Sequence, residues 1–175
     1  KILLVWQTIL PTALDGLHAR RFVANTLTPI GETLDIGTFD TKSHEHARIA
    51  PLPNGGAVIT WELVSANGKA DIYGHLLDSF GNKVGGPFKV NASSLSSDNH
   101  RPDAAALPDG RFVVVWESGI AGQTSIAMQR FKANGDKQGG KITISDGNSG
   151  PSTLPRVKPL PDATLAIVWE QAASA

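Results

Sequence analysis

Cysteine is absent from this sequence of 175 residues. Disulfide bonds, thiol nucleophiles and zinc sites built on thiolates are therefore excluded. An excess of charge is missing as well, because 16 Lys and Arg residues balance 16 Asp and Glu residues, for a formal net charge of +0. Nucleic-acid binding requires a basic face, and this balance provides no overall basic character, so no nucleic-acid partner is expected.

Long apolar runs are also missing. The opening run Ile2–Trp6 is far shorter than the roughly 20 apolar residues of a membrane-spanning helix, so membrane insertion is not expected. The composition is otherwise that of a globular protein, with 41% hydrophobic and 18% charged residues. The 18 glycines and 11 prolines stand between apolar runs, where turns belong, and none of them marks a linker. We therefore expect a single domain over residues 1–175.

Four tryptophans mark an internal repeat of about 55 residues. They lie 55, 55 and 53 residues apart, and each ends an apolar run and precedes a polar residue: Trp6, Trp61, Trp116 and Trp169. A Leu-Pro turn precedes each of the last three runs, at Leu52, Leu107 and Leu160. The repeat divides the chain into units of about 1–44 (partial), 45–99, 100–153 and 154–175 (partial).

Each complete unit is predicted to contain four short strands, because β-branched and aromatic residues alternate with turns rich in Gly, Pro, Asn and Asp. In the third unit these strands are 103–107, 111–117, 124–131 and 141–144. The second strand is apolar on both faces, since Phe112, Val114 and Trp116 alternate with Val113 and Val115. A strand covered on both sides indicates units that stack side by side.

The predicted fold is therefore all-β: a β-propeller, or an open fragment of one, built from four-stranded antiparallel blades. A β-trefoil is the alternative, followed by a two-sheet sandwich. The chain starts and stops within units and gives thirteen strands. It therefore either belongs to a larger propeller or pairs its open terminal strands with another copy, and self-association or adjoining repeats are the expected partners.

Several phrases resemble a repeat found in long exported bacterial proteins, often beside haemolysin-type calcium-binding or cadherin-like modules. The phrases are Leu107-Pro108-Asp109-Gly110-Arg111-Phe112-Val113-Val114-Val115-Trp116-Glu117, Gln129-Arg130-Phe131-Lys132-Ala133-Asn134-Gly135 and Val84-Gly85-Gly86-Pro87-Phe88-Lys89-Val90-Asn91. The resemblance implies a secreted or surface-attached propeller-like module, hence an extracellular or cell-surface location. It brings no catalytic residues with it.

Polar residues at repeated positions are the candidate ligand-binding groups: Glu62, Glu117, Glu170, Arg48, Arg101 and Arg156. The glutamates directly follow the tryptophans and could hydrogen-bond sugar hydroxyls, while arginines could bind carboxylated sugars. The alternative is structural, since a residue repeated in every unit can satisfy the backbone of a neighbouring blade or form an ion pair. Both interpretations stay open at this level.

A metal site is the second hypothesis. In a strand His44 and His46 would share a face, and His100 stands at the place equivalent to Glu45 in the next unit, so the three imidazoles are candidate ligands. Calcium is a further possibility, with oxygens from Asp98, Asn99, Asp103 and Asp109, although no known calcium-loop spacing occurs. No other cofactor is expected.

These observations predict a non-enzymatic extracellular or cell-surface propeller that serves adhesion or self-assembly. The alternative is a lectin-like propeller that binds glycans, and a glycoside hydrolase is the third possibility. No catalytic residue is assigned, because neither a nucleophile elbow nor a phosphate loop occurs.

Overall fold

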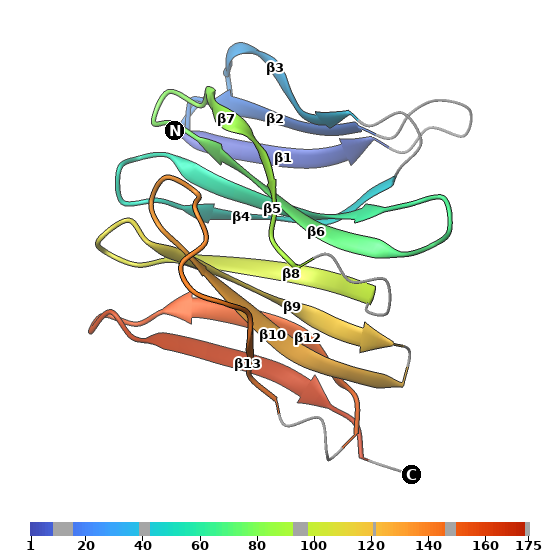
Figure 1. Cartoon of the computed structure of the whole chain (residues 1–175). Helices are drawn as coiled ribbons and strands as arrows, with labels where there is room; N and C mark the ends of the chain where they lie inside the picture. Colours follow the sequence, from blue (N-terminus) through green and yellow to red (C-terminus); the bar gives the residue numbers. More distant parts are fainter. Residues whose placement is uncertain (9–15, 39–42, 93–97, 121, 146–149, 174–175) are drawn as a thin grey trace.

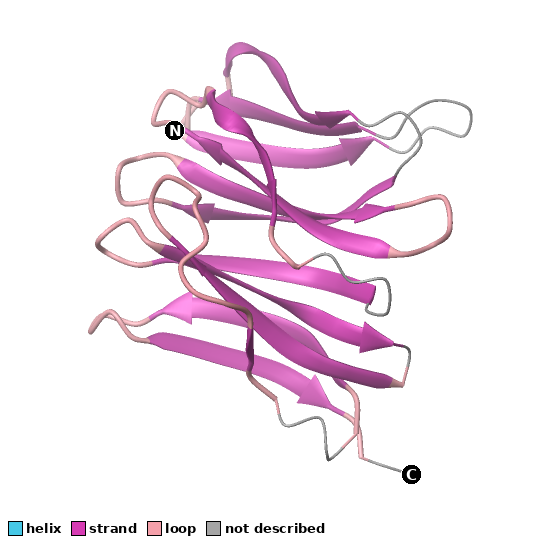
Figure 2. Ribbon diagram, viewed as in Figure 1, coloured by secondary structure: helices cyan, strands magenta, loops and turns pink. Residues whose placement is uncertain are grey.

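A computed structural model describes residues 1–8, 16–38, 43–92, 98–120, 122–145 and 150–173 of the chain. Within these ranges all regular structure is β (Figure 2). No helix among them has the length and apolar composition needed to cross a bilayer. The strands form four separate antiparallel sheets, which lie one above another in Figure 1 and which we call blades 1 to 4 in chain order.

The strand bounds are as follows. Blade 1 contains β1 (Ile2–Thr8), β2 (Gly16–Phe22) and β3 (Pro29–Thr38). Blade 2 contains β4 (Ser43–Pro51), β5 (Ala57–Val64), β6 (Ala70–Leu77) and β7 (Lys83–Lys89). Blade 3 contains β8 (Asp98–Ala106), β9 (Phe112–Ile120), β10 (Gln123–Phe131) and β11 (Ile142–Thr143). Blade 4 contains β12 (Ser152–Pro159) and β13 (Leu165–Gln171). Blades 2 to 4 begin at 43, 98 and 152, just ahead of the predicted unit boundaries at 45, 100 and 154.

The Leu-Pro turns close the first hairpin of blades 2, 3 and 4. In each, the carbonyl of the leucine accepts the N–H three residues later, for example that of Gly110 onto Leu107 at 3.0 Å. The Asn or Asp between them accepts a second bond, as Asp109 does from Arg111 N–H at 3.0 Å. Gly110 has a φ of 86°, a conformation that glycine adopts without steric cost. The repeated turn residues thus fix where the second strand begins.

Three apolar clusters hold the blades together, and each lies at a seam between neighbours. Leu17 and Ile36 of blade 1 pack with Ile59 and Trp61 of blade 2. A second cluster joins blades 2 and 3, and it contains Ile72, Leu76, Phe112, Trp116 and Phe131. A third joins blade 3 to Val157 of blade 4. The second strands of blades 2 and 3 are therefore covered on both sides, as their apolar sequences predicted.

The tryptophans divide into two classes. Trp61 and Trp116 are completely buried, at 0% exposure, in the seams in front of their blades. Trp6 and Trp169 retain 38% and 36% exposure, so the prediction that all four are core residues is wrong for these two. The reason is position: no described blade precedes β1, and β13 is the outer strand of a two-stranded sheet. Self-association through these terminal strands stays a prediction.

The first strands of successive blades meet at the inner side of the stack. β8 packs against both β4 and β12. At one end of these strands the three Leu-Pro turns line a single shallow apolar depression. Blades 2 and 4 each contribute two prolines to it, and blade 3 contributes one. Four-stranded antiparallel sheets that stack face to face around their first strands are propeller blades. This arrangement places one end of β4, β8 and β12, opposite the Leu-Pro turns, at the polar site described next.

Candidate functional site

A backbone irregularity recurs near the start of each first strand. The register of β4 against β5 shifts between Glu45 and Arg48, and the same shift occurs in β8 and β12 at equivalent places. One residue of each bulge has a positive φ, at 50°, 50° and 54° for His46, Arg101 and Leu154. This conformation is rare for residues other than glycine, and it is held only where surrounding contacts stabilise it.

The repeated glutamates supply those contacts. Glu62 of blade 2 accepts the backbone N–H of Arg101 in blade 3. Glu117 of blade 3 accepts the N–H of Leu154 in blade 4 at 2.7 Å. Both carboxylates are almost fully buried, at 1% and 2% exposure. The glutamate after the tryptophan therefore binds the bulge of the following blade, which is the structural alternative raised from the sequence. Glu170 is exposed, and no described blade follows it.

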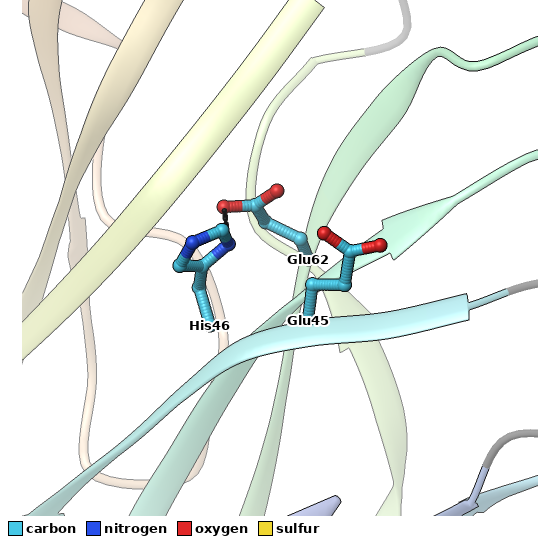
Figure 3. A group of neighbouring side chains, drawn as sticks. All are labelled: Glu45, His46 and Glu62. Carbon is cyan, nitrogen blue, oxygen red and sulfur yellow. Dashed lines mark ion pairs between the residues drawn. The ribbon is translucent and has the colours of Figure 1, made fainter. Parts of the chain in front are cut away.

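Glu62 makes more contacts with ionisable side chains than its shared role at the bulge requires. Nδ1 of His46 lies 2.8 Å from one of its oxygens, and Nδ1 of His100 lies 3.0 Å from the other. Nε2 of His100 lies 3.2 Å from Asp98. Figure 3 shows the ring of His46 directed at Glu62, with the carboxylate of Glu45 beside them. We call Glu45, His46, Glu62, Asp98 and His100 the bulge cluster.

The electrostatics of the cluster favour charged forms. Its hydrogen bond to Glu62 raises the pKa of His100 to about 9, against the effect of burial, and Asp98 adds to the rise. Burial alone would raise the pKa of Glu62, but hydrogen bonds from His100 and Arg101 and the charges of His46 and His100 lower it overall. Below about pH 9 the cluster therefore pairs an imidazolium with a buried carboxylate.

The three candidate arginines have different roles. Nη1 of Arg101 donates to both oxygens of Glu117, at 2.9 and 3.1 Å, which is the structural ion pair considered from the sequence. Arg48 and Arg156 instead each donate to the carbonyl of the preceding residue, at 3.0 and 2.7 Å. Among the described residues these two form no ion pair with the strand-end glutamates.

The predicted metal site of His44, His46 and His100 is wrong, because the bulge in β4 changes the direction of its side chains. Glu45 stands opposite Glu62 in the ladder, whereas His44 stands opposite Leu63, so His44 faces the other side of the sheet. His44 is 1% exposed and its ring lies 6.3 Å from that of Trp61. His44 and His46 therefore do not share a face, because the prediction assumed regular alternation. His46 and His100 do come together, across the seam between blades 2 and 3.

A metal could be held in this region only by a different set. Ligand atoms of Glu45, His46 and Glu62 lie within 4.8 Å of one another. However, both oxygens of Glu62 already accept hydrogen bonds, and Nδ1 of His46 is directed at one of them. A cation would have to displace the His46–Glu62 contact, so the arrangement favours an ion pair over a metal site.

The four candidate calcium ligands are not gathered. Asp98 accepts the N–H of Ala70, and Asp103 accepts that of Val157. Asn99 accepts the indole N–H of Trp116, and Asp109 closes its own turn. Each side chain has a separate structural partner, and the described residues bring no calcium-type oxygen cage together at these positions.

Sequence reasoning did not identify Glu45 and Asp98 as neighbours of Glu62, and it considered Asp98 only as a calcium ligand. A usable signal existed, because the residue before each bulge varies between blades, as Glu45, His100 and Thr153, while the glutamate after the tryptophan repeats. Variation at one position beside a repeated one separates individual chemistry from the shared scaffold.

No family model and no curated protein sequence matches the chain. Solved structures do. An α-L-arabinanase from Penicillium chrysogenum, complexed with arabinobiose, superposes with a TM-score of 0.64 at 13% identity, over 95% of this chain and 52% of the enzyme. The NanB sialidase from Streptococcus pneumoniae gives 0.63 at 13% identity, over 98% of this chain and 26% of the sialidase. A thermostable family-43 glycoside hydrolase gives 0.52 at 16% identity, over 95% and 65%.

At these low identities the superpositions show a shared fold and no more, and the fold is the predicted one, a β-propeller fragment. The chain spans about half the length of the arabinanase and about a quarter of the sialidase. The same comparisons contradict the predicted function and the prediction that the protein is not an enzyme. The three solved structures named above are an arabinanase, a sialidase and a family-43 glycoside hydrolase, and none of them is an adhesion or self-assembly module.

Proposed function

We propose that the chain is part of a carbohydrate-active β-propeller and that the bulge cluster binds glycan. The observation that carries the proposal is the gathering of Glu45, His46 and His100 around the buried Glu62 at the inner strands of two blades. The likeness in fold to an arabinanase, a sialidase and a family-43 glycoside hydrolase supports the choice of a sugar as ligand. An extracellular location, predicted from the repeat, fits a glycan-directed role.

The chemistry of the cluster suits hydroxyl groups. A sugar hydroxyl both donates and accepts, so its site needs carboxylate acceptors beside N–H donors. Glu45 offers acceptors. The side chain of His46 is 41% exposed, and its Nε2 takes no part in the contact with Glu62, so it is the candidate nitrogen for a sugar hydroxyl. His100 is 33% exposed, but both of its ring nitrogens are engaged, by Glu62 and Asp98. Glu62 is 1% exposed and fixes the orientation of both imidazoles from the buried side of the cluster. The repeated residue, Glu62, thus orients the two histidines, which are not repeated and which are partly exposed to solvent.

Glycoside hydrolysis is the second candidate function. Retaining glycosidases use two carboxyl groups roughly 5 Å apart, and oxygens of Glu45 and Glu62 lie within 4.8 Å. A lowered pKa also keeps Glu62 ionised, as a nucleophile requires. Against this, Glu62 is buried and both its oxygens accept bonds from the protein. Binding therefore has the stronger support of the two at this cluster.

The test separates binding from hydrolysis. The protein is titrated with arabinan, arabinoxylan and sialylated oligosaccharides in calorimetry, and release of reducing ends is measured in parallel. We expect His46→Ala and Glu45→Gln to weaken binding of the preferred glycan at least tenfold, and Glu170→Gln, at the exposed equivalent of Glu62, to leave it unchanged. Binding that both cluster variants retain in full, or no binding to any member of the panel, would overturn the proposal.

A further inference from the structure

The seam between blades 1 and 2 contains two adjoining cavities, far from the bulge cluster along the strands. One has a volume of about 320 Å³ and is lined by Arg21, Ile49, Pro51 and the turn around Gly81. The other has about 230 Å³ and is lined by Arg21, Glu32, Phe80 and the same turn. Leu3, Arg21 and Gly81 line both cavities, so the two form one hollow. Figure 1 shows the β6–β7 turn lying beside the start of β1 at this place.

The next seam, between blades 2 and 3, is an internal reference. There the equivalent turn glycine, Gly135, approaches Leu76, to which an added Cβ would come within 3.3 Å. Leu76 is 5% exposed and belongs to the apolar cluster that closes this seam. At the first seam Gly81 approaches the stem of Arg21 in the same way. Arg21 occupies the place of Leu76 in the repeat. Leu3 and Val58 both stand three residues before a repeated tryptophan, and Leu3 pairs with Arg21 as Val58 pairs with Leu76.

The guanidinium of Arg21 has no partner within the described part of the chain, in which neither a hydrogen bond nor an ion pair reaches it. The adjacent Arg20 differs, because its Nε and Nη2 both donate to the carbonyl of Gly31, at 3.1 and 2.8 Å. Arg21 is half-buried and lines both cavities. The planar fork of an arginine matches a carboxylate in a bidentate manner.

An exposed aromatic ring stands at the rim. Phe80 is 71% exposed, the highest value among the exposed large hydrophobic side chains described. The turn does not need it, because Asp78 shapes the loop by accepting the N–H groups of Phe80 and Asn82, both at 2.8 Å. The equivalent residue in blade 3 is Asn134, which bonds within its own turn to Asp136. The apolar ring in blade 2 therefore serves something outside the turn.

We propose that this hollow binds an acidic sugar, with the carboxylate on Arg21 and an apolar face of the sugar ring on Phe80. Aromatic rings pack on apolar surfaces, and an unpaired guanidinium at a cavity wall favours an anion. The carboxylate of Glu32 also lines the hollow and is the candidate acceptor for sugar hydroxyls. The choice of a sugar rests on the proposed function, whereas the choice of an acidic one rests on Arg21.

The repeat itself provides variants that keep the fold. Arg21→Leu and Phe80→Asn introduce the residues found at the equivalent places in the next blade. Arg130→Leu is the matched control, because Arg130 stands at the place of Arg21 in blade 3. Tri-galacturonate, a neutral arabino-oligosaccharide and acetate are each titrated while chemical shifts of the protein are followed by NMR.

We expect saturable binding of tri-galacturonate that falls at least tenfold in Arg21→Leu and in Phe80→Asn and is unchanged in Arg130→Leu. His46→Ala must leave this binding intact, so failure of the bulge cluster and failure of the hollow are distinguishable. Acetate binding as tight as that of tri-galacturonate would refute a sugar site. Equal binding of the neutral and acidic oligosaccharides would refute the role of Arg21, and no saturable binding of tri-galacturonate at about 1 mM would refute both.

Discussion

Replacing Glu62 by glutamine removes one negative charge from the centre of the bulge cluster and keeps the size of the side chain. The carboxylate holds His46 at 2.8 Å, His100 at 3.0 Å and the N–H of Arg101. A hydrogen bond to a charged group contributes roughly 1.5–3 kcal/mol. Both imidazoles are partly exposed, so water replaces much of what they lose, and the amide oxygen still accepts from Arg101. We therefore expect a loss of about 2 kcal/mol in the free energy of unfolding near pH 6.

The loss should depend on pH in a definite direction. The pKa of His100 is raised from 6.5 to about 9 in the folded protein, so folding favours its protonated form. Stability from this group is fully present below pH 6.5 and is lost as pH rises through 9. The difference between wild type and Glu62→Gln should therefore shrink to about 1 kcal/mol at pH 10, where only the bond to Arg101 still distinguishes the carboxylate.

The assay is urea unfolding followed by tryptophan fluorescence at pH 6 and pH 10. Glu170→Gln is the control, because Glu170 holds the same repeat position at an exposed place and should change stability by less than about 0.5 kcal/mol. If Glu62→Gln were as stable as wild type at pH 6, the carboxylate would not join the blades. If its loss were the same at both pH values, the coupling to His100 would be refuted.

Three further predictions follow from the same contacts. Trp116→Ala should cost about 3–5 kcal/mol in chemical unfolding and Trp169→Ala less than about 1.5, because the first ring is fully buried and the second is 36% exposed; equal losses would contradict the seam packing. In NMR titration the ring protons of His100 should report a pKa near 9 that falls in Glu62→Gln, and a normal value in wild type would refute the pairing. Asn99→Ala should cost about 1–2 kcal/mol because the indole N–H of Trp116 loses an acceptor at 2.9 Å, and an unchanged unfolding midpoint would show that bond to be dispensable.

The repeat and the strands were predictable because they depend on local patterns. The tryptophan spacing located the units, and apolar residues on both faces of the second strand indicated stacked blades. The Leu-Pro-Asp-Gly turns use side chains that close hairpins by themselves, as Asp109 and Gly110 do. These features do not depend on contacts with the neighbouring blade, so they can be predicted from the sequence alone.

The bulge was not predictable in the same way. His46, Arg101 and Leu154 all take a positive φ. Histidine is one of the residue types enriched in this conformation, but arginine and leucine are not, so local preference gives no sign of the bulges in blades 3 and 4. The conformation is stabilised from the neighbouring blade, as the carboxylates of Glu62 and Glu117 show for two of them. Reading β4 as a regular strand placed His44 beside His46 and produced the wrong histidine set. Contacts between neighbouring blades cannot be predicted from the alternation of residues along one strand.

The repeated bulge also explains where this protein can change without unfolding. What the three bulges share is a backbone N–H, and for Arg101 and Leu154 that N–H meets a buried glutamate. The side chain at the bulge is not part of that bond, and it differs in every blade. Substitution of the His46 side chain should therefore alter ligand binding more than stability, whereas substitution of Glu62 should lower stability as well. Arg101 is the exception among the bulge residues, because its side chain pairs with Glu117. The same division holds at the blade 1–2 seam, where the turn glycine Gly81 recurs in blade 3 as Gly135, whereas Phe80 is replaced there by Asn134. The functional residues of such a chain are therefore to be sought where its repeats disagree.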